Sequence, residues 1–248
     1  SYAASQYNIR EKEFTVVTVD AFGHILNQLT LPDRGHGCSI RPGQKEAVII
    51  GRRPGKFAVA FGLDNPNISK LFAPPSNRQF QGHAIFSKDG NYLFVTENNL
   101  VSQIGVIGVY DVNNSYVRVG EFSSYGIGPH EISLIPKTNI IVVANGGIIT
   151  HPDLPEIKLN TDTMEPSLAY IDYKNGKLID QYTPQVSRYK KLSIRHLIIP
   201  SSKDVIYACQ DQTPYQGKVP LVSMYSKGAK KLKHFRLPEK IHTAIGGY

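Results

Sequence analysis

Residues 81–98, QGHAIFSKDGNYLFVTEN, contain the pattern that decides the fold of this chain. HAIF at 83–86 and YLFVT at 92–96 are short apolar runs typical of β-strands, and SKDG between them is typical of a tight turn because glycine readily adopts a positive φ. The same pattern occurs around His36, His130 and His196, so that successive histidines lie 47, 47 and 66 residues apart. A period in the forties with several strands in each repeat predicts a β-propeller.

Each repeat contains four apolar runs, which we interpret as the four antiparallel strands of one blade. The four first strands are expected at residues 35–40, 83–86, 130–135 and 195–200. A hairpin over residues 14–32, preceded by a further strand near the N-terminus, is expected to form part of another blade, so that the chain enters the propeller partway through a sheet. The sequence therefore predicts an all-β protein of about 4.5–5 four-stranded blades in a single domain over residues 1–248, with no helix.

Composition narrows the possible partners. Of the 248 residues 19% are charged and 10% are aromatic, which disfavours disorder, and no apolar run reaches the length of a membrane-spanning helix. The net charge is +8, but the positively charged residues cluster only in short groups such as Arg52-Arg53. A nucleic-acid binder would concentrate its positive charge in longer runs or in a basic helix. We expect no membrane span and no nucleic-acid partner. Cys38 and Cys209 are interpreted as buried free thiols.

The third repeat is longer than the others because of an insertion at residues 146–167, between its second and third strands. Loops longer than about 12–15 residues in a compact domain are usually functional or disordered. The mixture of His151, Asp153, Lys158, Asn160 and Met164 is not typical of disorder. We expect an ordered irregular loop, which either carries part of a functional site or covers the mouth of the propeller.

The repeat also predicts which side chains share a face. In a four-stranded meander, the starts of first strands and the loops between second and third strands lie at the same end, so the repeated histidines are expected to surround the mouth of the central channel. Neutral imidazoles are good ligands for Fe, Cu or Zn, and a carboxylate can add an oxygen. A purely structural hydrogen bond between loop and strand is the alternative for each histidine. The candidate metal ligands are His36, His83, Glu97, His130, His151 and His196, with His83 and His130 as the central pair.

Arginines beside the histidines indicate a second kind of ligand, because guanidinium groups bind carboxylates and other anions in bidentate fashion. The candidate contacts for a small anionic ligand or metal chelate are Arg34, Arg52, Arg53, Arg78, Asn145, Lys158, Asn160 and Arg195. The sequence contains no G-x-S-x-G, H-E-x-x-H or phosphate-binding loop motif. No catalytic residue is therefore assigned, and a binding role is favoured over an enzymatic one.

Several segments together resemble a bacterial family named domain of unknown function 1513. The segments are RGHG at 34–37, RRPG at 52–55, GIGPHE at 126–131, ANGGI at 144–148, KLNTDTMEPSL at 158–168 and LSIRHL at 192–197, in order along nearly the whole chain. The resemblance implies an exported, periplasmic propeller, and members of the family are often encoded beside putative iron-uptake proteins. It implies a binding or accessory protein for a metal or an anionic metal chelate, linked to iron uptake, with another periplasmic protein as a possible partner. Ile157 stands where the family commonly has arginine, which removes one expected cationic contact.

The resemblance also bears on the extent of the propeller. The family continues past residue 248 with about two more blades, so we expect this chain to be the incomplete part of a seven-bladed propeller whose signal peptide is not included. The alternative is a five-bladed propeller in which residues 241–248 supply an inner strand to the first sheet. Two alternative functions are a metal-dependent redox or hydrolytic enzyme with its site at the channel mouth, and a protein-interaction scaffold.

Overall fold

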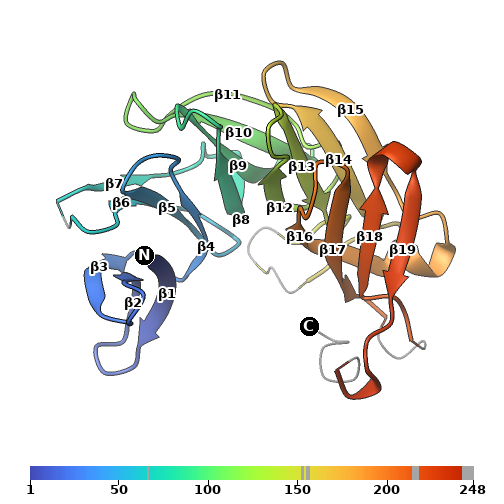
Figure 1. Cartoon of the computed structure of the whole chain (residues 1–248), viewed down its shortest axis with the longest axis horizontal. Coiled ribbons are helices and arrows are strands. Elements are labelled where there is room, and N and C mark those ends of the chain that lie inside the picture. The colour runs from blue at the N-terminus through green and yellow to red at the C-terminus, as the bar shows by residue number, and fades with distance from the viewer. Residues whose placement is uncertain (66, 152–153, 155–156, 214–217, 242–248) are drawn as a thin grey trace. The chain divides into compact units, whose positions relative to one another are not determined.

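The computed structural model describes the chain except residues 66, 152–153, 155–156, 214–217 and 242–248. Five β-sheets follow one another along the sequence (Figure 1). The first has three strands, β1 (Tyr2–Asn8), β2 (Glu13–Val19) and β3 (Ile25–Leu31). Residues 242–248, on which the five-bladed alternative depends, lie outside the described residues.

Each of the other four sheets has four strands, ordered as they occur in the sequence. The second sheet contains β4 (Gly35–Ile40), β5 (Glu46–Gly51), β6 (Ala58–Gly62) and β7 (Ser69–Phe72). The third contains β8 (Arg78–Phe86), β9 (Tyr92–Asn99), β10 (Gly105–Asp111) and β11 (Val117–Ser123). The fourth contains β12 (Pro129–Leu134), β13 (Ile140–Asn145), β14 (Ser167–Asp172) and β15 (Lys177–Tyr182). The fifth contains β16 (Leu192–Ile198), β17 (Asp204–Asp211), β18 (Val222–Ser226) and β19 (Lys231–Phe235).

These sheets confirm the predicted antiparallel blades and the three-stranded start of the chain. The predicted turn after residue 86 is also present, since Gly90 has a φ of 71° and its N–H donates to the Ser87 carbonyl at 2.9 Å. Two short 3-10 helices, η1 (Ser187–Lys191) and η2 (Lys227–Ala229), were not predicted. Both cysteines are free, but Cys38 is exposed and Cys209 is half-buried, so the prediction of two buried thiols was wrong for Cys38.

The described chain forms two compact units, Ser1–Val101 with Ile107–Glu121, and Ser102–Val106 with Phe122–Tyr248. That both units belong to a single domain over residues 1–248 stays a prediction.

In the first unit, β5 is buried on both faces because its side chains alternate between two hydrophobic clusters. Val48 and Ile50 pack in a cluster with Phe80, whereas Ala47 and Ile49 pack in a cluster with residues of the first sheet. A strand buried on both faces must be apolar throughout, which explains the AVII run at 47–50. Tyr110 and Tyr116 complete the first cluster, and the Tyr116 hydroxyl donates to Glu46 at 2.7 Å.

The second unit has its own core between the fourth and fifth sheets. Its buried members include Val142 and Leu168 from the fourth sheet, and Ile194 from the fifth. Tyr170 and Tyr207 are almost fully buried in the same cluster. Each unit thus contains a hydrophobic core in which tyrosines are among the largest side chains.

Residues 146–167 form an ordered connection in their described part. Asn160 holds its base, since its Oδ1 accepts the Ile149 N–H at 2.7 Å and its Nδ2 donates to the Gly147 carbonyl at 2.9 Å. Met164 is buried, and Lys191 donates to Asp162. The insertion is therefore attached to the fifth sheet through η1. Asp153 lies outside the described residues.

Truncation of Phe80 is expected to destabilise the first unit. Phe80 is fully buried, and replacing such a side chain by alanine usually lowers the free energy of unfolding by about 3–5 kcal/mol. The matched control is Phe22→Ala, because Phe22 is 87% exposed and its loss should change stability by less than about 0.5 kcal/mol. Urea unfolding followed by circular dichroism measures both, and equal effects of the two substitutions would contradict the described core.

Candidate functional site

Each of the four repeated histidines lies on the first strand of its sheet, where the pairing with the second strand is irregular. The register shifts fall between Gly35 and Cys38 in β4, Phe80 and Ala84 in β8, Pro129 and Ile132 in β12, and Ile194 and His196 in β16. Such β-bulges re-aim individual side chains, and they are common beside functional sites. The sequence repeat thus corresponds to a repeated backbone feature that sets the direction of each histidine.

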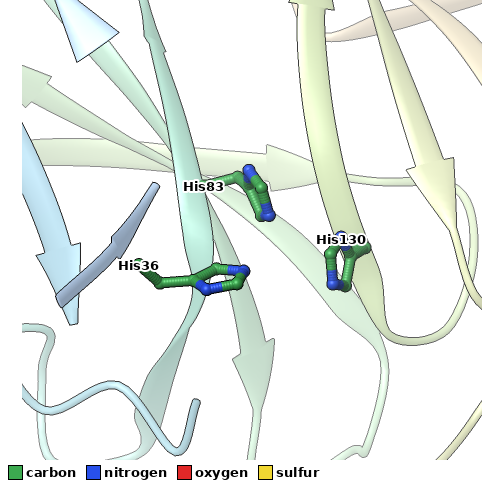
Figure 2. Close-up of side chains that lie close together, drawn as sticks. All are labelled: His36, His83 and His130. Carbon is green, nitrogen blue, oxygen red and sulfur yellow. The ribbon is translucent and has the colours of Figure 1, made fainter. Parts of the chain in front are cut away.

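In the first unit, His36 from β4 and His83 from β8 lie against each other (Figure 2). Their ring centroids are 4.9 Å apart with an interplanar angle of 85°, and a nitrogen of one ring lies within 4.8 Å of a nitrogen of the other. His36 is exposed and His83 is half-buried. The two imidazoles therefore form a partly accessible pair of nitrogen donors.

Two glycines allow this close approach of β4 and β8. A Cβ on Gly37 would lie 2.4 Å from the Gly82 carbonyl oxygen, and a Cβ on Gly82 would lie 2.6 Å from the His36 ring. Gly82 also has a φ of +94°, which other residues rarely adopt. In both His36-Gly37 and Gly82-His83, the histidine supplies an imidazole, and the adjacent glycine leaves room for the neighbouring strand.

The second unit repeats the arrangement with His130 from β12 and His196 from β16. Their ring centroids are 5.1 Å apart with an interplanar angle of 87°. Glu131 accepts a hydrogen bond from His196 Nδ1 at 3.0 Å and another from the Leu197 N–H at 2.9 Å. A carboxylate on one ring nitrogen fixes the tautomer and leaves the other nitrogen as a donor to a metal. Sequence reasoning missed Glu131, although the HE pair at 130–131 was visible.

Glu97 and Arg78 belong to a structural ion network in the first unit. Glu97 is fully buried and accepts hydrogen bonds from the Tyr110 hydroxyl at 2.7 Å and from Arg118 at 2.9 Å. Burial raises the pKa of Glu97, and the bonds from Arg118 and Tyr110 oppose this shift. Arg118 also pairs with Glu121, which accepts two bonds from Arg78 at 2.8 and 2.6 Å. These contacts engage both side chains, and the ligand roles of Glu97 and Arg78 stay predictions.

The other candidates of the first unit are arginines near His36. Arg34 is exposed directly before β4, and its carbonyl accepts the Arg52 N–H at 2.8 Å. Arg52 is exposed and Arg53 is half-buried after β5. Of these three arginines, Arg34 lines an open groove together with His36.

The candidates of the second unit are mostly held by internal hydrogen bonds. Asn145 is fully buried and donates to the Ser124 carbonyl at 2.9 Å, and Arg195 is 6% exposed and donates to Gln210 at 3.1 Å. Asn160 holds the base of the insertion, as described above. In the insertion, Lys158 forms a β-bridge with Thr150, and His151 accepts the Leu154 N–H at 3.2 Å. Ligand roles for Lys158 and His151 stay predictions.

The groove beside His36 has a volume of about 700 Å³. It is lined by Ser5, Gln6 and Tyr7 of β1, by Lys12 and Phe14, and by Arg34, Gly35 and His36. Sequence reasoning missed Lys12 and the residues of β1, because nothing in an isolated N-terminal strand shows that it lies beside β4.

Comparison with known families gives one match. A family model described as "Protein of unknown function (DUF1513)" matches residues 29–248. No curated protein matches the chain. No helix in the described part of the chain is long and apolar enough to cross a membrane.

Solved structures similar to this chain confirm the β-propeller fold. Hydrazine synthase from Kuenenia stuttgartiensis has a TM-score of 0.67 at 13% identity, covering 95% of this chain and 62% of its own. BamB from Moraxella catarrhalis has a TM-score of 0.52 at 14% identity, covering 88% and 57%. The WD40 repeats of RRP9 have a TM-score of 0.57 at 10% identity, covering 83% and 52%. The chain thus spans about half to three fifths of the length of these proteins.

The ion network predicts a specific acid sensitivity. Bonds from Arg78 and then Arg118 lower the pKa of Glu121 from 4.5 to about 2 in the folded chain. A depressed folded-state pKa stabilises the protein above pH 4.5, and this contribution is lost as the pH falls from about 4.5 to about 2. Glu121→Gln should therefore cost roughly 1–3 kcal/mol at neutral pH and reduce the pH dependence of stability in that window.

Urea unfolding at several pH values between 2 and 6 measures this difference. Glu165→Gln is the control, because the Glu165 side chain is 67% exposed and its contact with Lys190 is 3.5 Å long. Equal acid sensitivity in the wild type and in Glu121→Gln would contradict the assigned role.

Proposed function

Because the chain belongs to the family described as "Protein of unknown function (DUF1513)", whose description assigns no activity, we propose a function from the site itself: the binding of a transition-metal ion through paired histidines. The observation that carries this proposal is the edge-to-face pair of His36 and His83, with ring centroids 4.9 Å apart.

The geometry of the pair supports two nitrogen ligands to one ion. Zinc–nitrogen bonds are about 2.0–2.1 Å long, so two nitrogen atoms on the same ion lie at most about 4.2 Å apart. The nitrogens of His36 and His83 lie within 4.8 Å of each other, so a small rotation of the exposed His36 ring is sufficient. Imidazole suits Zn, Cu and Fe, and the pair alone does not select among them.

The pair in the second unit supports the same chemistry. His130 and His196 have nearly the same separation, and the Glu131 carboxylate orients His196 as carboxylates commonly orient metal-bound histidines. The prediction that His83 and His130 share one ion joins residues of the two units and stays a prediction. The variants below separate the two pairs.

A more specific form of this proposal is that the ligand is an anionic metal chelate rather than a free metal ion. It is supported by the exposed Arg34, which lines the same groove as His36. A periplasmic location, a partner protein there and a link to iron uptake rest on the family resemblance alone, and cell fractionation tests the location. The enzymatic alternative needs an open coordination position and a reachable acid or base, and no observation on the described residues favours it.

Metal binding should depend on the histidine pairs. Protein purified without a tag and stripped with a chelator is titrated with Zn²⁺, Cu²⁺ or Fe²⁺, and the bound metal is measured by elemental analysis after gel filtration. We expect at least one ion per chain for one of these metals. An ion at 100 times its Kd should stabilise the fold by about 2.7 kcal/mol. His36→Ala with His83→Ala should weaken binding at this site at least tenfold.

The control is His24→Ala, because the His24 side chain is 77% exposed and pairs with Asp20 in a turn away from the repeated histidines. This variant should bind metal as the wild type does. The double variant of His130 and His196 tests the second pair, and circular dichroism checks that each variant is folded. Unchanged metal content and affinity after the loss of all four histidines would refute the proposal and leave the structural role of these histidines.

A further inference from the structure

The bulge that carries His83 is larger than the bulges beside the other three repeated histidines. Residues 81–83 of β8 have a single residue of β9, Thr96, opposite them. The paired positions on either side are Phe80 with Glu97, and Ala84 with Val95. The bulges of β4 and β12 place two residues opposite one, and that of β16 inserts one residue between consecutive pairs. More of the backbone around His83 must therefore be fixed by contacts outside the ladder.

Thr96 differs from the residues at the same place in two other sheets. The residue opposite the bulge is Ile50 in the second sheet and Ala144 in the fourth, and both belong to hydrophobic clusters. Thr96 is fully buried, and its Oγ1 donates a hydrogen bond to the His83 carbonyl at 3.0 Å. Because a buried hydroxyl is costly unless it is bonded, this contact holds both groups in place. The Thr96 side chain thus attaches the last residue of the bulge to β9.

The start of the bulge is held from the other edge of β8. Gly55, in the loop between β5 and β6, forms an antiparallel bridge with Phe80. Each of the two donates its N–H to the carbonyl of the other, at 3.0 and 2.9 Å. A Cβ on Gly55 would lie 2.7 Å from Phe80 Cβ, so the bridge requires glycine at this position. The final glycine of the RRPG segment at 52–55 therefore has a structural role beside the histidine pair.

Between these two attachments the chain turns at Gly82, which has a φ of +94°. The next residue, His83, meets the ring of His36 edge to face. Both ends of the bulge are tied to neighbouring backbone, one through Phe80 and the other through the hydroxyl of Thr96. The direction of the His83 imidazole consequently depends on a side chain that lies on a different strand and is not itself a metal ligand.

We propose that Thr96 is a positioning residue, whose hydroxyl fixes the His83 backbone so that the rings of His36 and His83 are paired before any metal ion is bound. Ligands that are already held in place lose less freedom on binding. Removing a group that orients a metal ligand commonly weakens metal affinity about 10–100-fold. The effect on metal affinity rests on the proposed function, whereas the effect on the ring pair does not.

The first experiment measures the ring pair in the full chain without metal. Thr96→Val keeps the shape of the side chain but removes the hydroxyl, and Thr96→Ser restores the hydroxyl. Cross-relaxation between the ring protons of His36 and His83, assigned by replacing each histidine with alanine, reports the contact in NMR spectra. We expect it in the wild type and in Thr96→Ser, and at less than half its intensity in Thr96→Val.

The second experiment measures Zn²⁺ affinity in the same proteins. The relevant binding is the part that His36→Ala with His83→Ala removes. Thr96→Val should weaken this binding about tenfold, in line with the loss of other orienting groups, and Thr96→Ser should stay within about twofold of the wild type.

The matched control is Thr18→Val. Thr18 is 1% exposed in the same unit, and its hydroxyl donates to the Leu63 carbonyl, so this variant also loses a buried hydrogen bond from threonine to the backbone. Thr18 lies on β2, outside the first strands that carry the repeated histidines. The ring contact and the Zn²⁺ affinity should equal those of the wild type, and urea unfolding compares the stability of the two valine variants.

The other outcomes separate this inference from the proposed function. An unchanged ring contact in Thr96→Val would overturn the positioning role, whether or not the wild type binds Zn²⁺. Equal losses in Thr18→Val, or no rescue by Thr96→Ser, would show general loosening of the unit and would overturn it as well. A lost ring contact with unchanged Zn²⁺ affinity would overturn the link to the site. If the wild type binds no Zn²⁺ while the ring contact still follows the Thr96 hydroxyl, zinc binding by the pair fails and the positioning role stands.

Discussion

Face-to-face packing of neighbouring sheets is the interaction on which the rest of this structure depends. In β5 the side chains of Val48 and Ile50 enter one cluster and those of Ala47 and Ile49 enter another, so a single strand joins two interfaces. Burying apolar surface on both faces is the main source of stability in such a strand. It also fixes the register, because a slip of one residue would exchange the two faces. With the register fixed, the bulges turn His36, His83 and His130 out of the ladder. In β16 the bulge leaves out Arg195 instead, and His196 pairs with Ala208.

Because of this packing, the polar side chains of the first unit are either buried with internal partners or exposed at the ends of strands. Glu97 is held between Tyr110 and Arg118 in the interior, where a carboxylate is tolerated only with such partners. His36 lies at a bulge and is exposed. Glu97 and His36 thus differ in burial and in backbone setting, although both belong to the same unit.

The sequence was sufficient for the strands and for the placement of the histidines on first strands, because both depend on short apolar runs with a regular spacing. The sequence was insufficient where the environment of a residue depends on contacts with residues far away along the chain. The buried contacts of Glu97 were not predicted, because its partners lie 13 and 21 residues away along the chain. Cys38 was expected in the core, yet it occupies an outward position of β4. The contact of Gly37 with Gly82 joins two repeats, and no pattern within one repeat reveals it.

The buried tyrosines have a consequence for how this protein can be observed. The chain has no tryptophan, so its near-ultraviolet signals come mainly from its 14 tyrosines. Tyr110 and Tyr116 lie in the core of one unit, and Tyr170 and Tyr207 lie in the core of the other. Burial raises the pKa of all four phenols above that of a free tyrosine. Tyrosine absorbance and emission therefore form a natural optical reporter of core integrity, with probes in both units and no added label.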